Sequence, residues 1–101
     1  MKALVLLVLG ACGGPRLPYP TAASVAAQQA RNPSVTLEEL ELGRTTVIQA
    51  CGRCHAPPRP SKESIEDWAE VTEEMAVKAK LSDEEAGRVL AYLQSASVPT
   101  E

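Results

Sequence analysis

The chain has 101 residues, enough for one small domain, and its formal net charge is −3. This charge makes nucleic acid a poor candidate partner, because proteins bind nucleic acid through an excess of basic residues. The sequence contains no Phe, one Trp and two Tyr, so few large side chains are available to fill a small core. A bound apolar cofactor would supply the missing bulk.

The first twelve residues have the layout of an export signal. A lysine at position 2 is followed by an apolar run that ends in Leu-Gly-Ala-Cys at positions 9–12. A charged start, a hydrophobic core and a small-residue cleavage site are the parts of a secretory signal. The segment resembles a bacterial lipoprotein signal peptide, which implies that residues 1–11 are removed and that Cys12 is lipidated in a periplasm-facing membrane. A short apolar helix with an incidental cysteine is the alternative.

Gly, Pro, Ala and Gln dominate the next segment, and no apolar periodicity is sustained there. This composition predicts a lipidated cysteine and a flexible tether over residues 12–34. As a random coil the tether would reach roughly 25 Å, enough to hold a domain near a membrane without fixing its orientation. An Ala-rich helix over residues 22–31 is the alternative.

Three helices are predicted within a domain that covers residues 35–98. The first begins at a capping box, Thr-Leu-Glu-Glu at positions 36–39, and leads to the pair of cysteines. Its predicted inward face follows helical spacing and consists of Leu37, Leu40, Val47 and Ile48. Prolines at positions 57, 58 and 60 predict a loop over residues 56–61, because the residue before a proline disfavours helix.

The second helix is predicted to run from about Ser61 to Ala79. Its inward stripe consists of Ile65, Trp68, Thr72, Met75 and Ala79. The opposite face is rich in glutamate, which indicates a solvated surface or, alternatively, a docking surface for a basic partner.

The third helix is predicted to begin at a second capping box, Ser-Asp-Glu-Glu at positions 82–85, and to end before Pro99. Its inward face consists of Ala86, Val89, Leu90 and Leu93. The sequence has no convincing strand pattern. The predicted fold class is therefore all-α.

Cys51, Cys54 and His55 belong to the pentapeptide Cys-Gly-Arg-Cys-His, which has the C-x-x-C-H spacing of a c-type haem site. In such a site two thiols add to the haem vinyl groups and the adjacent imidazole reaches the iron. A redox dithiol would be expected in a βαβ setting, and zinc would need a fourth donor beside these three. One covalent haem c is therefore the predicted cofactor.

Over residues 36–97 the chain resembles the class I cytochromes c. Gly43, eight residues before Cys51, and Tyr92 match the positions at which that family packs its first helix closely against its last. The resemblance implies a small domain of three main helices wrapped around one haem. The spacing of Trp68 and Met75 is similar to that of short haem domains serving periplasmic dehydrogenases, and it implies that Met75 is the second axial ligand.

Several of these residues have an alternative role. Met75 is the only methionine left once the signal is removed, yet a lone Met also serves as core packing. The sixth iron site would then be open or taken by Lys78 or Lys80. Trp68 is predicted either to donate its indole N–H to a haem propionate or to be the main apolar residue of the core. Two arginines are weaker candidates for offsetting the propionate charge, Arg53 and Arg59.

No set of catalytic acid, base and nucleophile is evident, so we predict an electron carrier rather than an enzyme. It would face the periplasm, tethered to a membrane through Cys12, and its partners would be redox proteins such as a periplasmic dehydrogenase, an oxidase or another cytochrome. One alternative is a haem sensor or small peroxidase with an open or displaceable sixth ligand. The other is a haem-free structural lipoprotein with a Cys51–Cys54 disulfide.

Overall fold

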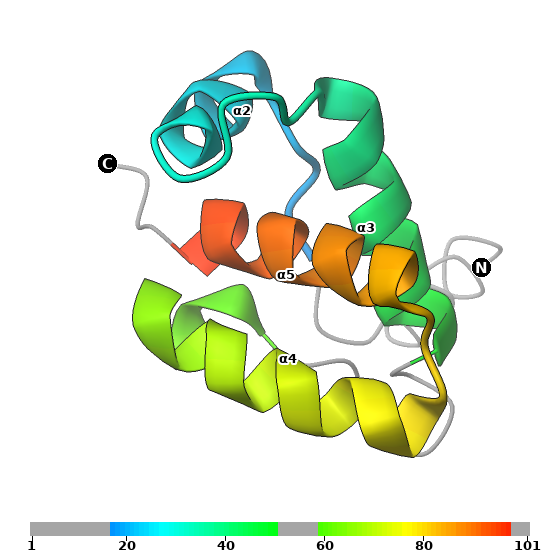
Figure 1. Cartoon of the computed structure of the whole chain (residues 1–101). Coiled ribbons are helices and arrows are strands. Elements are labelled where there is room, and N and C mark those ends of the chain that lie inside the picture. Colours follow the sequence, from blue (N-terminus) through cyan, green and yellow to red (C-terminus); the bar gives the residue numbers. More distant parts are fainter. Residues whose placement is uncertain (1–16, 51–58, 98–101) are drawn as a thin grey trace, which may run out of the picture.

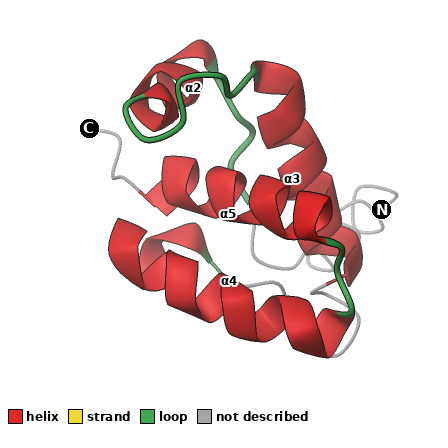
Figure 2. Ribbon diagram, in the orientation of Figure 1, coloured by secondary structure: helices red, strands yellow, loops and turns green. Residues whose placement is uncertain are grey.

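The computed structural model of the chain describes residues 17–50 and 59–97, and all regular structure in these residues is helical (Figure 2). The elements are α2 (Ala22–Gln29), α3 (Leu37–Ala50), the short 3-10 helix η2 (Pro60–Lys62), α4 (Ile65–Ala79) and α5 (Asp83–Ser97). The predicted all-α class is confirmed, and α3, α4 and α5 correspond to the three predicted helices. Within the described residues, no helix is both long and apolar enough to cross a bilayer.

Helix α5 lies in the middle of the molecule (Figure 1). It contacts α3, α4, α2 and η2, with α4 on the side opposite to α2. Because α5 is covered from several directions, it is buried beyond its predicted inward face. The additional buried residues are Ala91, Tyr92 and Ser95.

The beginnings of the helices follow local capping chemistry. At the start of α3, the Glu39 backbone N–H donates to the Thr36 hydroxyl (3.2 Å), and the Thr36 N–H donates to the Glu39 carboxylate (3.3 Å). The same reciprocal pair joins Ser82 and Glu85 ahead of α5. These bonds confirm both predicted capping boxes. Each box satisfies two backbone donors that the first helical turn leaves free.

Helix α4 begins and ends through different devices. Its first turn is capped by the Ser64 hydroxyl, which accepts from the Asp67 N–H at 3.1 Å. Its last turn closes at Lys80, which adopts the left-handed conformation with φ of 58°, and the following Leu81 N–H donates to the Ala76 carbonyl. This ending turns the chain back so that α5 can pack antiparallel to α4 (Figure 1).

The closest approach between helices is the crossing of α3 and α5 at Gly43. A Cβ atom built at this position would overlap the Arg88 carbonyl oxygen and would lie 2.9 Å from the Tyr92 Cβ. Only a residue without a side chain permits this separation. The close packing of α3 and α5 outweighs the cost of about 1 kcal/mol that glycine carries inside a helix. The predicted packing of Tyr92 over Gly43 is confirmed.

The main core gathers side chains from all three predicted helices. Val47 from α3, Trp68 from α4 and Val89, Tyr92 and Leu93 from α5 are buried in one cluster. A smaller cluster lies beside it and contains Leu40, Val35 and Ala91. On α3, two predicted inward residues, Leu37 and Ile48, are instead 42% and 40% exposed, because the stripe of Leu40, Gly43 and Val47 faces α5.

The flexible tether predicted over residues 12–34 is wrong from residue 17 onward. Residues 17–35, which we call the strap, form α2 and pack against the domain. Leu17 is buried in the main core and Val35 in the smaller cluster, so the strap is fastened by an apolar side chain at each end. The alternative helix considered for residues 22–31 matches α2 closely.

Polar contacts also hold the strap. The Tyr92 hydroxyl donates to the Pro18 carbonyl at 2.7 Å, and the Arg44 Nε donates to the Leu17 carbonyl at 3.2 Å. The buried Gln28 donates its amide to the Gln94 side chain at 3.0 Å. These bonds satisfy buried polar groups that would otherwise lose their hydration without compensation.

Candidate functional site

The predicted haem-binding pentapeptide lies outside the described residues, as does the predicted lipidation site. Nothing in the structure therefore bears on Cys12, Cys51, Arg53, Cys54 or His55. What the structure does describe is the helix that precedes the pentapeptide. Helix α3 continues to Ala50, so Cys51 follows the last helical residue directly in the sequence.

Met75 lies in α4 on the stripe that faces the interior. It is half-buried and packs against the main core, where Trp68 is one of the central residues. The two side chains are seven residues apart, which is close to two helical turns. The prediction that they face the same way is confirmed.

The end of α3 and the end of α4 border one cavity. Its volume is about 170 Å³, and its walls include Ala50 from α3 together with Ala79 and Leu81 from α4 and the turn after it. Met75 precedes Ala79 by one helical turn on the same face. The point at which the chain enters the pentapeptide is therefore near the C-terminal half of α4, where Met75 lies.

Trp68 is 1% exposed, and its indole N–H donates to the Pro60 carbonyl at 2.7 Å. This bond occupies the single donor of the indole and fixes η2 against α4. A haem propionate would have to displace Pro60 to make the predicted contact. Arg59, which precedes η2, has an exposed side chain.

Thr72 carries the one buried side-chain polar atom without a hydrogen-bond partner in the described part of the chain. It lies between Trp68 and Met75 on the inward stripe of α4, and its hydroxyl oxygen is buried. Thr45, on α3, shows the ordinary alternative, because its hydroxyl donates to the Glu41 carbonyl one turn earlier. The inward face of α4 therefore has an unmet capacity for a polar contact.

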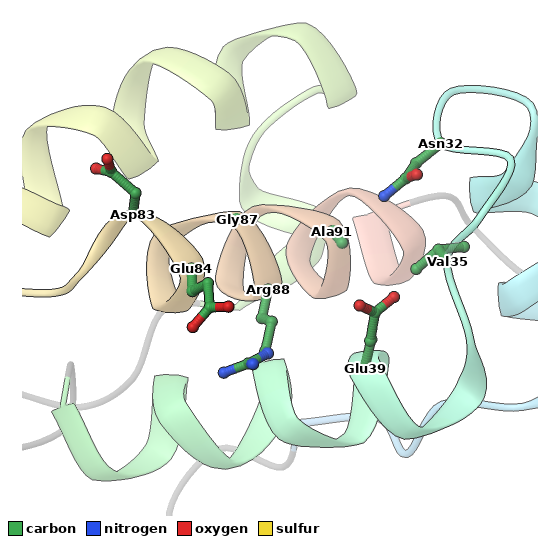
Figure 3. A pocket seen from close by; sticks show the side chains of 8 residues that line it. All are labelled: Asn32, Val35, Glu39, Asp83, Glu84, Gly87, Arg88 and Ala91. Carbon is green, nitrogen blue, oxygen red and sulfur yellow. The ribbon is translucent and has the colours of Figure 1, made fainter.

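Another cavity, of about 230 Å³, lies between α3, α5 and the loop that joins α2 to α3 (Figure 3). Its walls are mixed, with Asp83 and Glu84 at one end and Glu39, Asn32 and Val35 at the other. Arg88 extends from α5 toward α3, between these two ends. Among the described residues, no three His, Cys, Asp or Glu side chains are grouped so as to hold a metal ion.

The sequence-based interpretation missed the cluster formed by Arg44 and both tyrosines. The Arg44 guanidinium carbon lies 3.7 Å from the centre of the Tyr19 ring, a cation–π contact. Burial raises the pKa of Tyr92 to about 12, an effect that the nearby Arg44 charge partly offsets. An arginine on a helix of otherwise ordinary pattern gives no local signal of this role, because its partners Leu17 and Tyr19 are distant in sequence.

Comparison with known proteins adds no relative: the chain matches no family model, no curated protein and no solved structure.

Proposed function

We propose that the protein is a membrane-tethered periplasmic electron carrier with one covalently bound haem c. The observation that carries the proposal is the C-x-x-C-H pentapeptide, which begins directly after the last residue of α3. This helix is itself fixed by its crossing with α5 at Gly43. The pentapeptide is thus attached to a rigid helix.

The described residues fit such a group. Apolar side chains that are only half-buried surround the main core, including Val71, Met75 and Leu81. They leave apolar surface that a porphyrin ring could cover, and the core is short of aromatic residues. The unpartnered hydroxyl of Thr72 lies on the same stripe, where a polar atom of the bound group or an accompanying water would satisfy it.

In this proposal each residue has a defined task. Cys51 and Cys54 would hold the ring by thioether bonds, and His55 and Met75 would bind the iron. The iron supplies one-electron chemistry, and a thioether ligand raises its reduction potential relative to a second imidazole. Trp68 keeps water from this side of the core, because its ring is buried and its only donor is bound to the protein.

The decisive experiment is a reduced-minus-oxidised absorption spectrum of the exported full-length protein. The expected spectrum is that of a low-spin, six-coordinate c-type haem, and the haem should stay attached through denaturing electrophoresis. Met75→Ala should abolish the band that methionine ligation gives to ferric haem, whereas Val77→Ala, an exposed change on the same helix, should leave it intact.

Two results would contradict parts of the proposal. A high-spin spectrum that is unchanged by Met75→Ala would indicate an open sixth site, as in a haem sensor or small peroxidase. A purified periplasmic form with no haem absorption and an oxidised Cys51–Cys54 pair would indicate the structural lipoprotein instead.

A further inference from the structure

The strap changes how the domain would be connected to a lipid anchor. Because the backbone carbonyls of Leu17 and Pro18 are bound to Arg44 and Tyr92, the chain is fixed to the domain at residues 17 and 18. The chain from Cys12 to Leu17 spans at most about 18 Å when fully extended, at about 3.6 Å per residue. A domain joined to the bilayer by so short a connection cannot turn freely.

The surface nearest this connection has an unusual exposed side chain. Tyr19, two residues after Leu17, is 75% exposed, although its ring stacks on the Arg44 guanidinium. A tyrosine with an apolar ring and a polar tip, next to an arginine, is well suited to the boundary between lipid headgroups and water. The Arg44 guanidinium beside this ring carries the positive charge that lipid phosphate attracts.

The distribution of charged residues also favours an orientation with the strap toward an anionic membrane. The strap contains one arginine, Arg31, and no acidic residue, and Arg16 directly precedes it, whereas all 13 Asp and Glu residues of the chain lie at position 38 or later. The exposed side of α4 carries several of these acids, among them Glu66, Glu70 and Glu73. An anionic headgroup layer therefore attracts the strap and repels the outer face of α4.

We infer that the packed strap leaves only a short connection between the domain and the lipidated Cys12. This connection holds the surface around Tyr19 and Arg44 against anionic phospholipid headgroups. The inference rests on the proposed lipidation of Cys12 and does not require the haem. It replaces a freely tumbling domain with an oriented one. The outer face of α4 then points away from the bilayer, toward soluble partners.

Energy transfer from a dye on the protein to acceptor lipids tests this orientation. The full-length lipoprotein is reconstituted into phosphatidylcholine vesicles that contain phosphatidylglycerol and a headgroup-labelled acceptor, in about 0.15 M salt. The dye is attached through Glu41→Cys, one turn before Arg44 on α3, or through Glu70→Cys on α4. Both positions are exposed and acidic, so the two variants lose the same charge.

The expected result is several-fold more efficient energy transfer from position 41 than from position 70. A flexible Gly/Ser segment of about twenty residues inserted after Gly14 should bring the two efficiencies together, because it restores a long tether. Equal efficiencies in the uninterrupted chain would overturn the inference, and so would a difference that survives the insertion.

Two further readouts separate failure of the inference from failure of the proposed function. Protein that does not bind vesicles and lacks the acyl mass on Cys12 would refute the lipidation itself. Dye bound at more than one site per chain, together with loss of the covalent haem stain, would refute the haem proposal. In that case Cys51 and Cys54 would be the extra labelled thiols, and variants with both replaced by Ser would still report the orientation.

Discussion

The two sides of α5 are held in different ways. On the side of α3 and the strap, helix and chain are in close contact at Gly43, and Tyr92, Arg44 and Gln28 each donate a hydrogen bond across the interface. On the side of α4, packing is mainly apolar, and Thr72 has a buried hydroxyl without a partner. In the described residues, the polar groups named at the first interface have hydrogen-bond partners, whereas the second interface contains a buried hydroxyl that has none.

This difference indicates where specificity of the fold resides. Residues at a close helix crossing, and polar groups in buried hydrogen bonds, tolerate little substitution. Steric overlap or the loss of a hydrogen-bond partner directly lowers the free energy of unfolding. Half-buried apolar side chains such as Met75 and Leu81 can accept a further apolar surface. Four changes, from the largest expected effect to the smallest, test the contrast.

Gly43→Ala should have the largest effect, because the added Cβ would overlap the Arg88 carbonyl and force α3 away from α5. We expect the free energy of unfolding to fall by about 3 kcal/mol, measured by urea denaturation followed by circular dichroism. Gly87→Ala is the matched control, since nothing lies within 4 Å of a Cβ there. That variant should be more stable by up to about 1 kcal/mol. Equal effects at the two glycines would contradict the close crossing.

High pH should weaken the strap interface through Tyr92. Its pKa is raised from 10.0 to about 12 by burial, so the folded protein favours the neutral phenol. The associated stability is fully present below pH 10 and is lost as pH rises toward 12, a change of between about 2 and 3 kcal/mol. Tyr92→Phe should remove this part of the pH dependence in unfolding experiments from pH 9 to 12. An unchanged slope in that variant would mean that other groups cause the loss.

Arg44→Met keeps the long apolar stem but removes the bond to the Leu17 carbonyl and the stacking on Tyr19. We expect a loss of about 1 to 2 kcal/mol in the free energy of unfolding, with faster amide hydrogen exchange in the strap. Arg59→Met, on an exposed arginine at the start of η2, is the control and should change little. Strap exchange that stays as slow as in the parent protein would show that Leu17 and Val35 suffice to fasten it.

Thr72→Val should have the smallest effect, and it should be a gain. The substitution replaces a buried hydroxyl that lacks a partner by a methyl group of similar size, so haem-free protein should be stabilised by about 1 kcal/mol. Thr45→Val, which removes an exposed hydroxyl already bonded to the Glu41 carbonyl, should be neutral or slightly destabilising. A destabilised Thr72→Val protein would mean that the hydroxyl has a partner in solution.

The fold class and the helix starts could be predicted because their signals are local. Thr36 and Glu39, or Ser82 and Glu85, are three residues apart and form the same bonds wherever the helix packs. The choice of inward face on α3 was less secure, because two adjacent stripes are apolar. Gly43 decides between them, since only the stripe that contains it can approach α5 closely.

The strap could not be predicted because its signals are long-range. Tyr92 and Pro18 are 74 residues apart, and Gln28 and Gln94 are 66 residues apart. A Pro-rich segment with a single leucine has the composition of a tether, and nothing in that composition reveals that Leu17 is buried. For the candidate site, the C-x-x-C-H pentapeptide is a local pattern as well, whereas the bond from Trp68 to Pro60 depends on how η2 folds back on α4.

The distant pairing of the strap also sets an order of events. The strap contacts α5, the last helix of the chain, and its bond from Tyr92 forms only after residue 92 has been delivered. In an exported protein, which leaves the cytoplasm from its N-terminal end, residues 17–35 would stay undocked until translocation is nearly complete. Under the proposed lipidation, cleavage and acylation at Cys12 would therefore precede docking of the strap.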